Sequence, residues 1–267
     1  FEPGKALVVI GAGYIGLEVA AVARKRGLDV TVIESAIRPL ARVTSPEVAG
    51  FFLDVHTAEG VRFVLNAQAA VIKGETQVRA VGLANGVEVK ADLVIAGIGV
   101  TPETGLAEKA GLQVDNGIVT DAHARTSDPA IYAIGDCARR PLSTYGGRMA
   151  RLESVHNALE GAKIAAAMIM GASPPPEETP WFWSDQYDVK LQIAGLFNGY
   201  DQVVLRGDQQ ARSFAAFYLE QGRLIAVDAI NRPGEFAAGK MMIAKGMRPD
   251  PARLADPAIP MKTILSG

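Results

Sequence analysis

The sequence predicts an α/β fold, in which parallel strands alternate with helices, followed by a small α+β domain at the C-terminal end. Three observations predict this class. The chain opens with a strand–helix–strand unit around a glycine-rich turn, a proline-rich stretch interrupts it at residues 173–180, and short alternating strands follow that stretch.

The opening unit is the most informative part of the chain. Residues 5–10 form a short apolar run rich in β-branched side chains, which is typical of a buried strand. Residues 17–26 carry apolar side chains at helical spacing, and residues 29–33 predict a second strand that ends on Glu34. The turn between the first strand and the helix reads Gly-Ala-Gly-Tyr-Ile-Gly at positions 11–16.

Each glycine of this turn has a distinct expected role. Gly11 makes the tight turn, Gly13 lets a pyrophosphate approach the backbone, and Gly16 allows close packing of helix on strand. The helix N-terminus offers N–H groups and positive dipole to phosphates. Glu34, 18 positions after Gly16, can accept hydrogen bonds from a ribose diol. The unit therefore predicts a Rossmann-like dinucleotide-binding domain, and the alternative is a tight turn that binds nothing.

The acidic residue also favours NAD over NADP. A 2′-phosphate would place negative charge against the carboxylate of Glu34, and the next residue, Ser35, supplies no compensating cation. Arg38 is the nearby cation that can approach such a phosphate.

Composition excludes several classes of protein. The chain has 267 residues, 49% hydrophobic and 21% charged, which suits two ordinary globular domains. A net charge of −2 lacks the excess of positive charge expected of a protein that binds nucleic acid or an acidic membrane. Neither a membrane-spanning run nor a signal peptide is recognisable in the sequence. The single cysteine, Cys137, fits a reducing cytoplasm, and no pattern of metal ligands stands out. We expect a cytoplasmic monomer or weak homodimer.

The segment after Glu34 continues the first domain. A helix over 46–59 places Val48, Phe51, Phe52 and Val55 on one face. Strand-like segments follow at 61–64, 69–73, 77–83, 87–90 and 91–96. The last strand runs into Gly97-Ile-Gly99, which predicts either a second close approach to a ligand or a plain turn.

The next segment predicts a short helix over 104–111 and strands over 117–120 and 130–134. The second strand is followed directly by Gly135 and Asp136. The Asp136 carboxylate either accepts hydrogen bonds from a hydroxylated ligand or stabilises a turn or a helix N-terminus. Residues 148–170 predict one long helix with a buried face made by Val155, Leu159, Ala162, Ala166 and Ile169.

The proline-rich stretch at 173–180 is the clearest domain boundary. Trp181 and Trp183 follow it, and core or interface packing explains both side chains without a ligand. A helix over 234–245 closes a series of strands at 181–184, 189–195, 202–206, 213–219 and 223–229.

Five stretches together resemble one known family, the NADH-dependent, FAD-containing ferredoxin reductases of bacterial oxygenase and cytochrome P-450 systems, and within it the putidaredoxin reductase and biphenyl dioxygenase reductase group. The stretches occur in the family's order along the whole chain. They are residues 9–18 (VIGAGYIGLE), 96–102 (AGIGVTP), 126–137 (TSDPAIYAIGDC), 151–158 (RLESVHNA) and 180–186 (PWFWSDQ).

The resemblance implies three domains. Residues 1–99 would bind NAD, residues 100–174 would be the C-terminal part of a split FAD-binding domain, and residues 175–267 would form a C-terminal α+β reductase domain. The chain starts without Met, which fits the absence of the N-terminal part of the FAD domain. FAD is therefore expected in the complete protein, together with NAD(H).

The resemblance also assigns site residues. Gly11, Gly13 and Gly16 would hold the NAD pyrophosphate and Glu34 the ribose, and Tyr14 would also bind NAD. Ile15, Glu18 and Gly99 would lie along the nicotinamide half. Gly135, Asp136 and the backbone at Val155 and His156 would contact FAD. Glu18 and Trp183 would act at the flavin–nicotinamide stack. The histidine at 156 replaces a proline common in relatives, so we assign it no titrating role.

The implied activity is electron transfer from NADH through FAD to a [2Fe-2S] ferredoxin or a rubredoxin. We expect Arg139, Arg140 and Arg148, near the flavin half, to attract an acidic acceptor; the alternative is that they are ordinary solvated surface residues. Two alternatives remain. An NADH-responsive redox sensor resembling apoptosis-inducing factor would share the domains. A disulfide reductase is disfavoured, because residues 1–99 contain no cysteine and residues 178–267 no histidine.

Overall fold

The computed structural model describes residues 2–266; Phe1 and Gly267, the outermost residues of the first and third expected domains, lie outside the described part. The chain divides into two compact units. The first runs up to Gly99 and adds residues 184–191 and 208–216, and the second comprises residues 100–183, 192–207 and 217–267.

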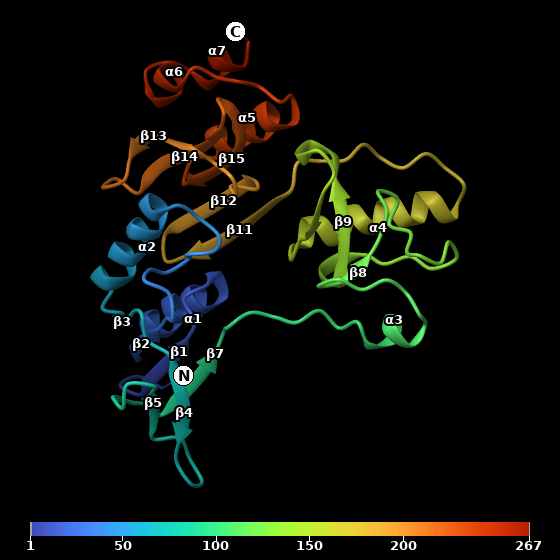
Figure 1. Ribbon diagram of the computed structural model, residues 1–267. Helices are drawn as coiled ribbons and strands as arrows, with labels where there is room; N and C mark the ends of the chain where they lie inside the picture. The colour runs from blue at the N-terminus through green and yellow to red at the C-terminus, as the bar shows by residue number, and fades with distance from the viewer. Residues whose placement is uncertain (1, 267) are drawn as a thin grey trace. The chain divides into compact units, whose positions relative to one another are not determined.

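A four-stranded parallel sheet organises the first unit, in the order β3-β2-β1-β7 (Figure 1). Its strands pair in parallel throughout, as expected when helices connect successive strands. The predicted strands at 5–10 and 29–33 are confirmed, and the first helix begins at Tyr14 rather than at Leu17. The elements are β1 (Ala6–Ile10), α1 (Tyr14–Lys25), β2 (Asp29–Ile33), α2 (Pro46–Ala58), β3 (Arg62–Val64) and β7 (Leu93–Ala96).

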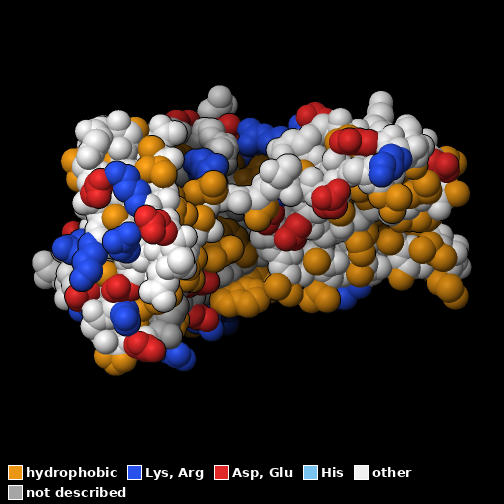
Figure 2. Space-filling model, turned by 90° about the horizontal axis from the view of Figure 1, so that it is seen from below, with side chains coloured by type: hydrophobic (Ala, Val, Ile, Leu, Met, Phe, Trp, Pro, Cys, Tyr) orange, Lys and Arg blue, Asp and Glu red, His pale blue; other side chains and the backbone are white. Residues whose placement is uncertain are grey.

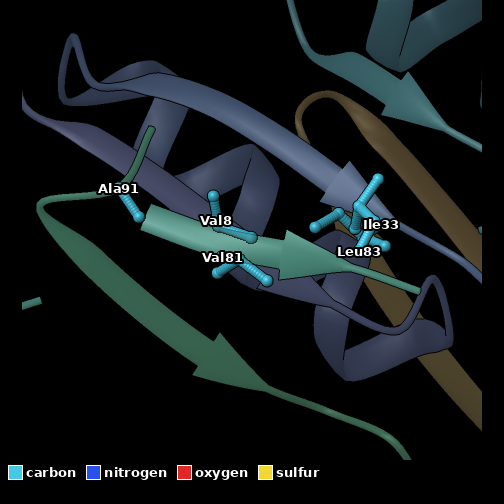
Figure 3. Close-up of a cluster of buried hydrophobic side chains, with 5 residues drawn as sticks. All are labelled: Val8, Ile33, Val81, Leu83 and Ala91. Carbon is cyan, nitrogen blue, oxygen red and sulfur yellow. The ribbon is translucent and has the colours of Figure 1, made fainter. Parts of the chain in front are cut away.

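A three-stranded antiparallel sheet in the order β4-β5-β6 packs against this parallel sheet. It contains β4 (Ala69–Lys73), β5 (Ala80–Leu83) and β6 (Glu88–Lys90). Val81 and Leu83 of β5 meet Val8 of β1 and Ile33 of β2 in a buried cluster, which Ala91 completes (Figure 3). These buried side chains give the carboxyl ends of β1 and β2 a rigid base.

The predictions for residues 100–174 are correct in part. Helix α3 (Gly105–Lys109) and β8 (Ile118–Val119) lie inside the predicted ranges. Residues 130–134 form no strand; Tyr132 makes only an isolated antiparallel bridge with Arg125, and its side chain packs against the buried Ile164 and Ala165 of the following helix. The predicted helix over 148–170 is wrong in its first part.

That first part is a strand, β10 (Arg148–Arg151), which pairs antiparallel with β9 (Ala138–Leu142). Helix α4 (Val155–Ile169) begins only after it, where Ser154 accepts a hydrogen bond from the backbone N–H of Asn157. A serine in extended conformation that satisfies this N–H is a strong helix N-cap, and it overrides the helical spacing upstream. β8 pairs with β9 to complete a three-stranded sheet.

The face of α4 that the sequence predicts to be buried is exposed. Val155 is 59% exposed, Leu159 57% and Ile169 66%, whereas the helix packs within its unit through Gly161, Ile164 and Ala165 on another side. Figure 2 shows other hydrophobic side chains (orange) exposed on one face of the molecule. Helix α4 therefore has two apolar faces and only one is covered by the described residues.

The chain after the proline-rich stretch forms a five-stranded sheet in the order β11-β12-β15-β14-β13. All five predicted strands and the predicted helix are confirmed, and two short helices follow. The elements are β11 (Trp181–Gln186), β12 (Val189–Gly195), β13 (Gln202–Asp208), β14 (Ser213–Glu220), β15 (Arg223–Ile230), α5 (Pro233–Ala244), α6 (Pro251–Ala255) and α7 (Met261–Leu265).

His56 on α2 is a buried polar residue of the first unit. Its ring is fully buried, packs edge-on against Phe63 and Tyr187, and contacts the Gln186 side-chain oxygen at 2.8 Å through Nε2. Burial lowers the pKa of His56 to about 4 from its ordinary value of 6.5, and the hydrogen bond to Gln186 opposes this shift only in part. The imidazole is therefore neutral at physiological pH.

This depressed pKa predicts an acid-sensitive fold. In the unfolded chain His56 takes up a proton below pH 6.5, whereas the folded chain takes it up only near pH 4, so stability falls as the pH drops through this range. The loss is on the order of 3 kcal/mol. Urea unfolding at pH 7.5 and 4.5 should show a smaller difference for His56→Gln than for the natural sequence. His123→Gln, at an exposed histidine, should keep the natural difference; equal pH dependence in all three proteins would contradict the assignment.

Candidate functional site

The glycine-rich turn brings three backbone segments into contact at the carboxyl end of the parallel sheet. Gly11 has a φ of +99°, and a Cβ there would lie 2.4 Å from the carbonyl oxygen of Gly97. A Cβ on Gly16 would lie 2.2 Å from the carbonyl oxygen of Gly11. Only glycine fits at these two positions, and their missing side chains let α1 start directly against β1 and β7.

Gly13 differs from its two neighbours in the turn. It lies at the N-cap of α1 with ordinary extended angles, and no heavy atom lies within 4 Å of where its Cβ would be. Among the described residues no side chain caps this helix, and its first turn contains no acidic residue. The N-terminus of α1 therefore presents an open backbone surface with positive potential, which suits a phosphate group.

Glu34 is held at the edge of this surface. Its carboxylate accepts hydrogen bonds from the backbone N–H of Ala12 at 2.7 Å and of Ala36 at 2.8 Å, and from the Ser35 hydroxyl at 3.1 Å. The bond to Ala12 ties the end of β2 to the glycine-rich turn. A carboxylate oriented in this way is a fixed acceptor for hydroxyl groups of a ligand.

A pocket of about 570 Å³ opens between these elements. Gly11, Gly13, Tyr14 and Glu34 line it, whereas Gly16 lies beneath the turn and Ile15, Glu18 and Gly99 lie outside the lining. Its walls are residues 10–14, 33–36, 40–43, 67–69 and 96–98. The volume and the mixture of apolar walls with a few polar groups are typical of a cofactor or small-molecule site.

The cation at this pocket is Arg42, which the sequence did not single out. Arg42 lines the pocket, and its Nη2 lies 3.9 Å from the Cβ position at Gly99. Arg38, the expected cation, instead donates hydrogen bonds to the backbone carbonyls of Ala41 at 3.2 Å and Ser45 at 3.5 Å. The sequence showed two arginines in one loop, and only the folded loop decides which of them faces the pocket.

Ile15 and Glu18 lie three residues apart on α1 and hence on neighbouring positions of one side of the helix. Ile15 is 68% exposed, while one carboxylate oxygen of Glu18, Oε1, accepts a hydrogen bond of 2.6 Å from the Ser184 hydroxyl. Gly99 has a φ of +110°.

The remaining predicted residues belong to the second unit, around the start of α4. Gly135, with φ of +74°, opens a short 3₁₀ turn with Asp136, and its carbonyl oxygen accepts a hydrogen bond from the Asn157 side chain at 3.4 Å. Val155 and His156 are the first two residues of α4. The structure thus brings the 135–137 turn and the start of α4 together.

His156 also connects α4 to the tryptophans. Its Nε2 contacts Glu178 at 3.3 Å, and its ring lies 5.4 Å from that of Trp181. Trp181 in turn lies 5.8 Å from Trp183, and the Lys240 ammonium lies over the Trp181 ring. Trp183 itself is 42% exposed, so its ring keeps a free surface.

The expectation of three surface arginines for an acidic partner is wrong for Arg140. Arg140 is buried and forms an ion pair with Glu160 of α4, because β9 packs that side chain against the helix. Arg139 forms an ion pair with Asp115. Arg148 is exposed and donates to the carbonyl of Asn198 at 3.4 Å.

Two features are absent from residues 2–266. No helix in this range has both the length and the apolar character needed to cross a membrane. No three His, Cys, Asp or Glu side chains in the same range are grouped as metal ligands.

Known proteins share both parts of this architecture. The pyridine nucleotide-disulphide oxidoreductase family matches residues 2–162, and the reductase C-terminal family matches residues 181–265. The α/β fold with a separate C-terminal domain is thereby confirmed.

Individual relatives are similar over nearly the whole chain. The putidaredoxin reductase of Pseudomonas putida is 47% identical over 97% of this chain and 62% of its own length. The rubredoxin-NAD(+) reductase of Pseudomonas putida is 45% identical over 85% of this chain and 59% of its own. A crystal structure of the covalent putidaredoxin reductase–putidaredoxin complex superposes with a TM-score of 0.96 and 46% identity, over 99% of this chain and 64% of that one.

The chain thus spans less than two thirds of the length of these relatives. The resemblance that the five sequence stretches indicate is confirmed. The chain belongs to the pyridine nucleotide-disulphide oxidoreductase family.

Proposed function

We propose that this chain binds NADH in the pocket at the carboxyl ends of β1 and β2 and serves in electron transfer from NADH through FAD to a ferredoxin or a rubredoxin. One observation carries the proposal. The open backbone face at Gly13 and the fixed carboxylate of Glu34 border one pocket, where they match the pyrophosphate and the ribose diol of a dinucleotide.

Each part of the pocket has a role in this proposal. The N–H groups at the start of α1 bind the pyrophosphate, and Arg42 adds a positive charge beside it. Glu34 accepts hydrogen bonds from the adenosine ribose. Ile15, Glu18 and Gly99 contact the nicotinamide half.

The pocket favours NADH over NADPH on electrostatic grounds. A 2′-phosphate would lie against the Glu34 carboxylate, whose position is fixed by Ala12 and Ala36. Arg38 donates to two backbone carbonyls instead of facing this position. Like charges at contact distance in a partly buried site are strongly unfavourable.

The division into domains follows the same proposal. Residues 1–99 form the NAD-binding domain, residues 100–174 form part of an FAD-binding domain, and residues 175–267 form the C-terminal reductase domain. The exposed apolar face of α4 supports the second assignment, because an amphipathic helix in water needs a partner for each apolar face. FAD fits the turn at Gly135-Asp136, where the exposed Asp136 lies next to the N-terminus of α4.

The chemistry itself would come from the cofactor: FAD, when bound, would supply an acceptor for the hydride of NADH and a one-electron donor to an iron–sulfur or iron protein. Asp136 and the backbone of Val155 and His156 hold the cofactor. Glu18 orients the nicotinamide, and Trp183, with its exposed ring face, covers the reacting rings. No side chain of the site needs to act as a nucleophile.

The electron acceptor of this protein is proposed from the names of its relatives. The names of the relatives include a putidaredoxin reductase and a rubredoxin reductase, so either kind of small iron protein fits. Such redox encounters use small, weak interfaces. We propose a cytoplasmic protein that is a monomer or a weak homodimer.

Anaerobic titration of the intact, flavin-loaded protein with NADH and NADPH, followed by flavin absorbance in stopped flow, tests this function. We expect fast bleaching by NADH and much slower bleaching by NADPH. Slow reduction by both, with a long-lived charge-transfer complex, would favour an NADH-responsive sensor over a reductase.

Glu34→Gln is predicted to weaken NADH binding about tenfold, because a charge-assisted hydrogen bond to the ribose is lost. It should also narrow the preference for NADH over NADPH, since the negative charge facing a 2′-phosphate is gone. Dissociation constants for both nucleotides measure this. Glu75→Gln, at an exposed loop position outside the pocket, is the matched control and should change neither constant; an unchanged preference in Glu34→Gln would refute the assignment.

Two glycine variants separate binding from folding. The added methyl group of Gly13→Ala meets no other atom, so the unfolding free energy of this variant should stay within about 0.5 kcal/mol of that of the natural protein. NADH binding should weaken, because the methyl group projects into the space proposed for the pyrophosphate. Gly16→Ala should instead lower stability, because its Cβ would clash with the Gly11 carbonyl. Urea unfolding and NADH titration of both variants test this; tight NADH binding by Gly13→Ala would place the pyrophosphate elsewhere.

A further inference from the structure

A network of polar side chains runs from the surface of α1 into the first unit. It consists of Glu18 on α1, Ser184 and Gln186 on β11, His56 on α2 and Tyr187, which follows β11; this set is called the Glu18 network below. Ser184 is 1% exposed, and Gln186 and His56 are fully buried. Because β11 alternates its side chains, Ser184 and Gln186 lie on one face of the strand.

The members are joined end to end by hydrogen bonds. Ser184 Oγ lies 2.6 Å from Glu18 Oε1, and Gln186 Nε2 lies 3.0 Å from Ser184 Oγ. Gln186 Oε1 lies 2.8 Å from His56 Nε2. The Tyr187 hydroxyl lies 3.5 Å from the other ring nitrogen, Nδ1, at the limit of a hydrogen bond.

The carboxylate of Glu18 sets the direction of every bond in this network. A carboxylate only accepts, so the Ser184 hydroxyl donates to it and must itself accept from the Gln186 amide nitrogen. The Gln186 oxygen then faces His56 and accepts from Nε2–H. His56 is therefore the tautomer with its proton on Nε2, and Nδ1 is left to accept from the Tyr187 hydroxyl.

The surroundings prevent this network from rearranging. His56 packs against Phe63 and Tyr187, and its burial disfavours the protonated ring, which would reverse the last bond. A donor turned the wrong way would leave a buried polar atom unsatisfied, which is costly in a site closed to water.

Glu18 is the only member of the network on the helix that begins at the dinucleotide pocket. It lies on the same side of α1 as the exposed Ile15. Its oxygen Oε1 is occupied by Ser184, and no described residue donates a hydrogen bond to Oε2. The second oxygen is thus held in one direction and is available to a donor on a ligand, such as a carboxamide N–H.

We propose that Ser184, Gln186 and His56 are positioning residues, which fix the Glu18 carboxylate so that its second oxygen binds the carboxamide of the nicotinamide. This role rests on the proposed function, since it requires NADH to extend from the pocket along α1. It makes the segment 184–187, more than 160 residues after Glu18 in the chain, part of the nucleotide site.

A double-mutant cycle on the intact, flavin-loaded protein tests the coupling. Ser184→Ala should slow flavin reduction by NADH about tenfold, the effect of losing one hydrogen bond to a charged group. Ser184→Thr keeps the hydroxyl and should restore most of the rate. In a Glu18→Ala background, Ser184→Ala should add no further loss, because the carboxylate it orients is gone. Ser213→Ala, at a half-buried serine of β14, is the matched control and should leave the rate unchanged.

Nitrogen-15 NMR of the His56 ring tests the direction of the bonds without any nucleotide. The natural protein should show a neutral ring with its proton on Nε2 from pH 6 to 8, and Ser184→Ala should shift the ring toward a mixture of both tautomers. A ring protonated on Nδ1 in the natural protein would overturn the proposed network.

The outcomes separate the two proposals. If NADH fails to reduce the flavin of the natural protein, the proposed function fails, and the positioning role fails with it, while the NMR result still decides the bond directions. If the natural protein is reduced rapidly but the losses from Ser184→Ala and Glu18→Ala simply add, only the positioning role is refuted.

Discussion

The contact of three backbone segments without intervening side chains is the constraint on which the candidate pocket depends. Gly11 and Gly16 lack the Cβ atoms that would collide with the carbonyls of Gly97 and Gly11. Helix α1 therefore starts against the sheet at the point where β1 lies between β2 and β7. The pocket, the open face at Gly13 and the hydrogen bond from Ala12 to Glu34 all follow from this close approach.

Helix α1 also links this pocket to a distant part of the sequence. Its N-terminus forms the open backbone face at the pocket, and one turn later Glu18 joins a buried network that ends at His56 and Tyr187. The network contains a neutral, buried imidazole, so the predicted acid sensitivity of the fold and the proposed positioning of Glu18 have one physical origin. Protonation of His56 would therefore lower the stability of the fold and disturb the hydrogen bonds that orient Glu18.

Helix α4 shows how a correct pattern leads to a wrong burial assignment. The spacing of Val155, Leu159 and Ile169 correctly identifies an apolar face, yet this face is exposed among the described residues. Periodicity reports which side chains share a side of a helix, but it contains no information on what covers them. The predicted start of this helix is wrong for a similar reason. Residues 148–151 form a strand because β10 pairs with β9, and helical spacing in the sequence contains no information on such a pairing.

The sequence by itself determined the β1–α1–β2 unit, the places of its three glycines and the position of Glu34, because strand and helix periods and glycine geometry are local properties. It also determined the five strands of the C-terminal sheet. Only the tertiary structure decided that Arg42 faces the pocket, that Arg140 is buried against Glu160, and that Gln186 meets His56 across 130 residues of sequence. Such contacts arise from the packing of whole elements, and no local pattern of residues records which distant side chain an element will meet.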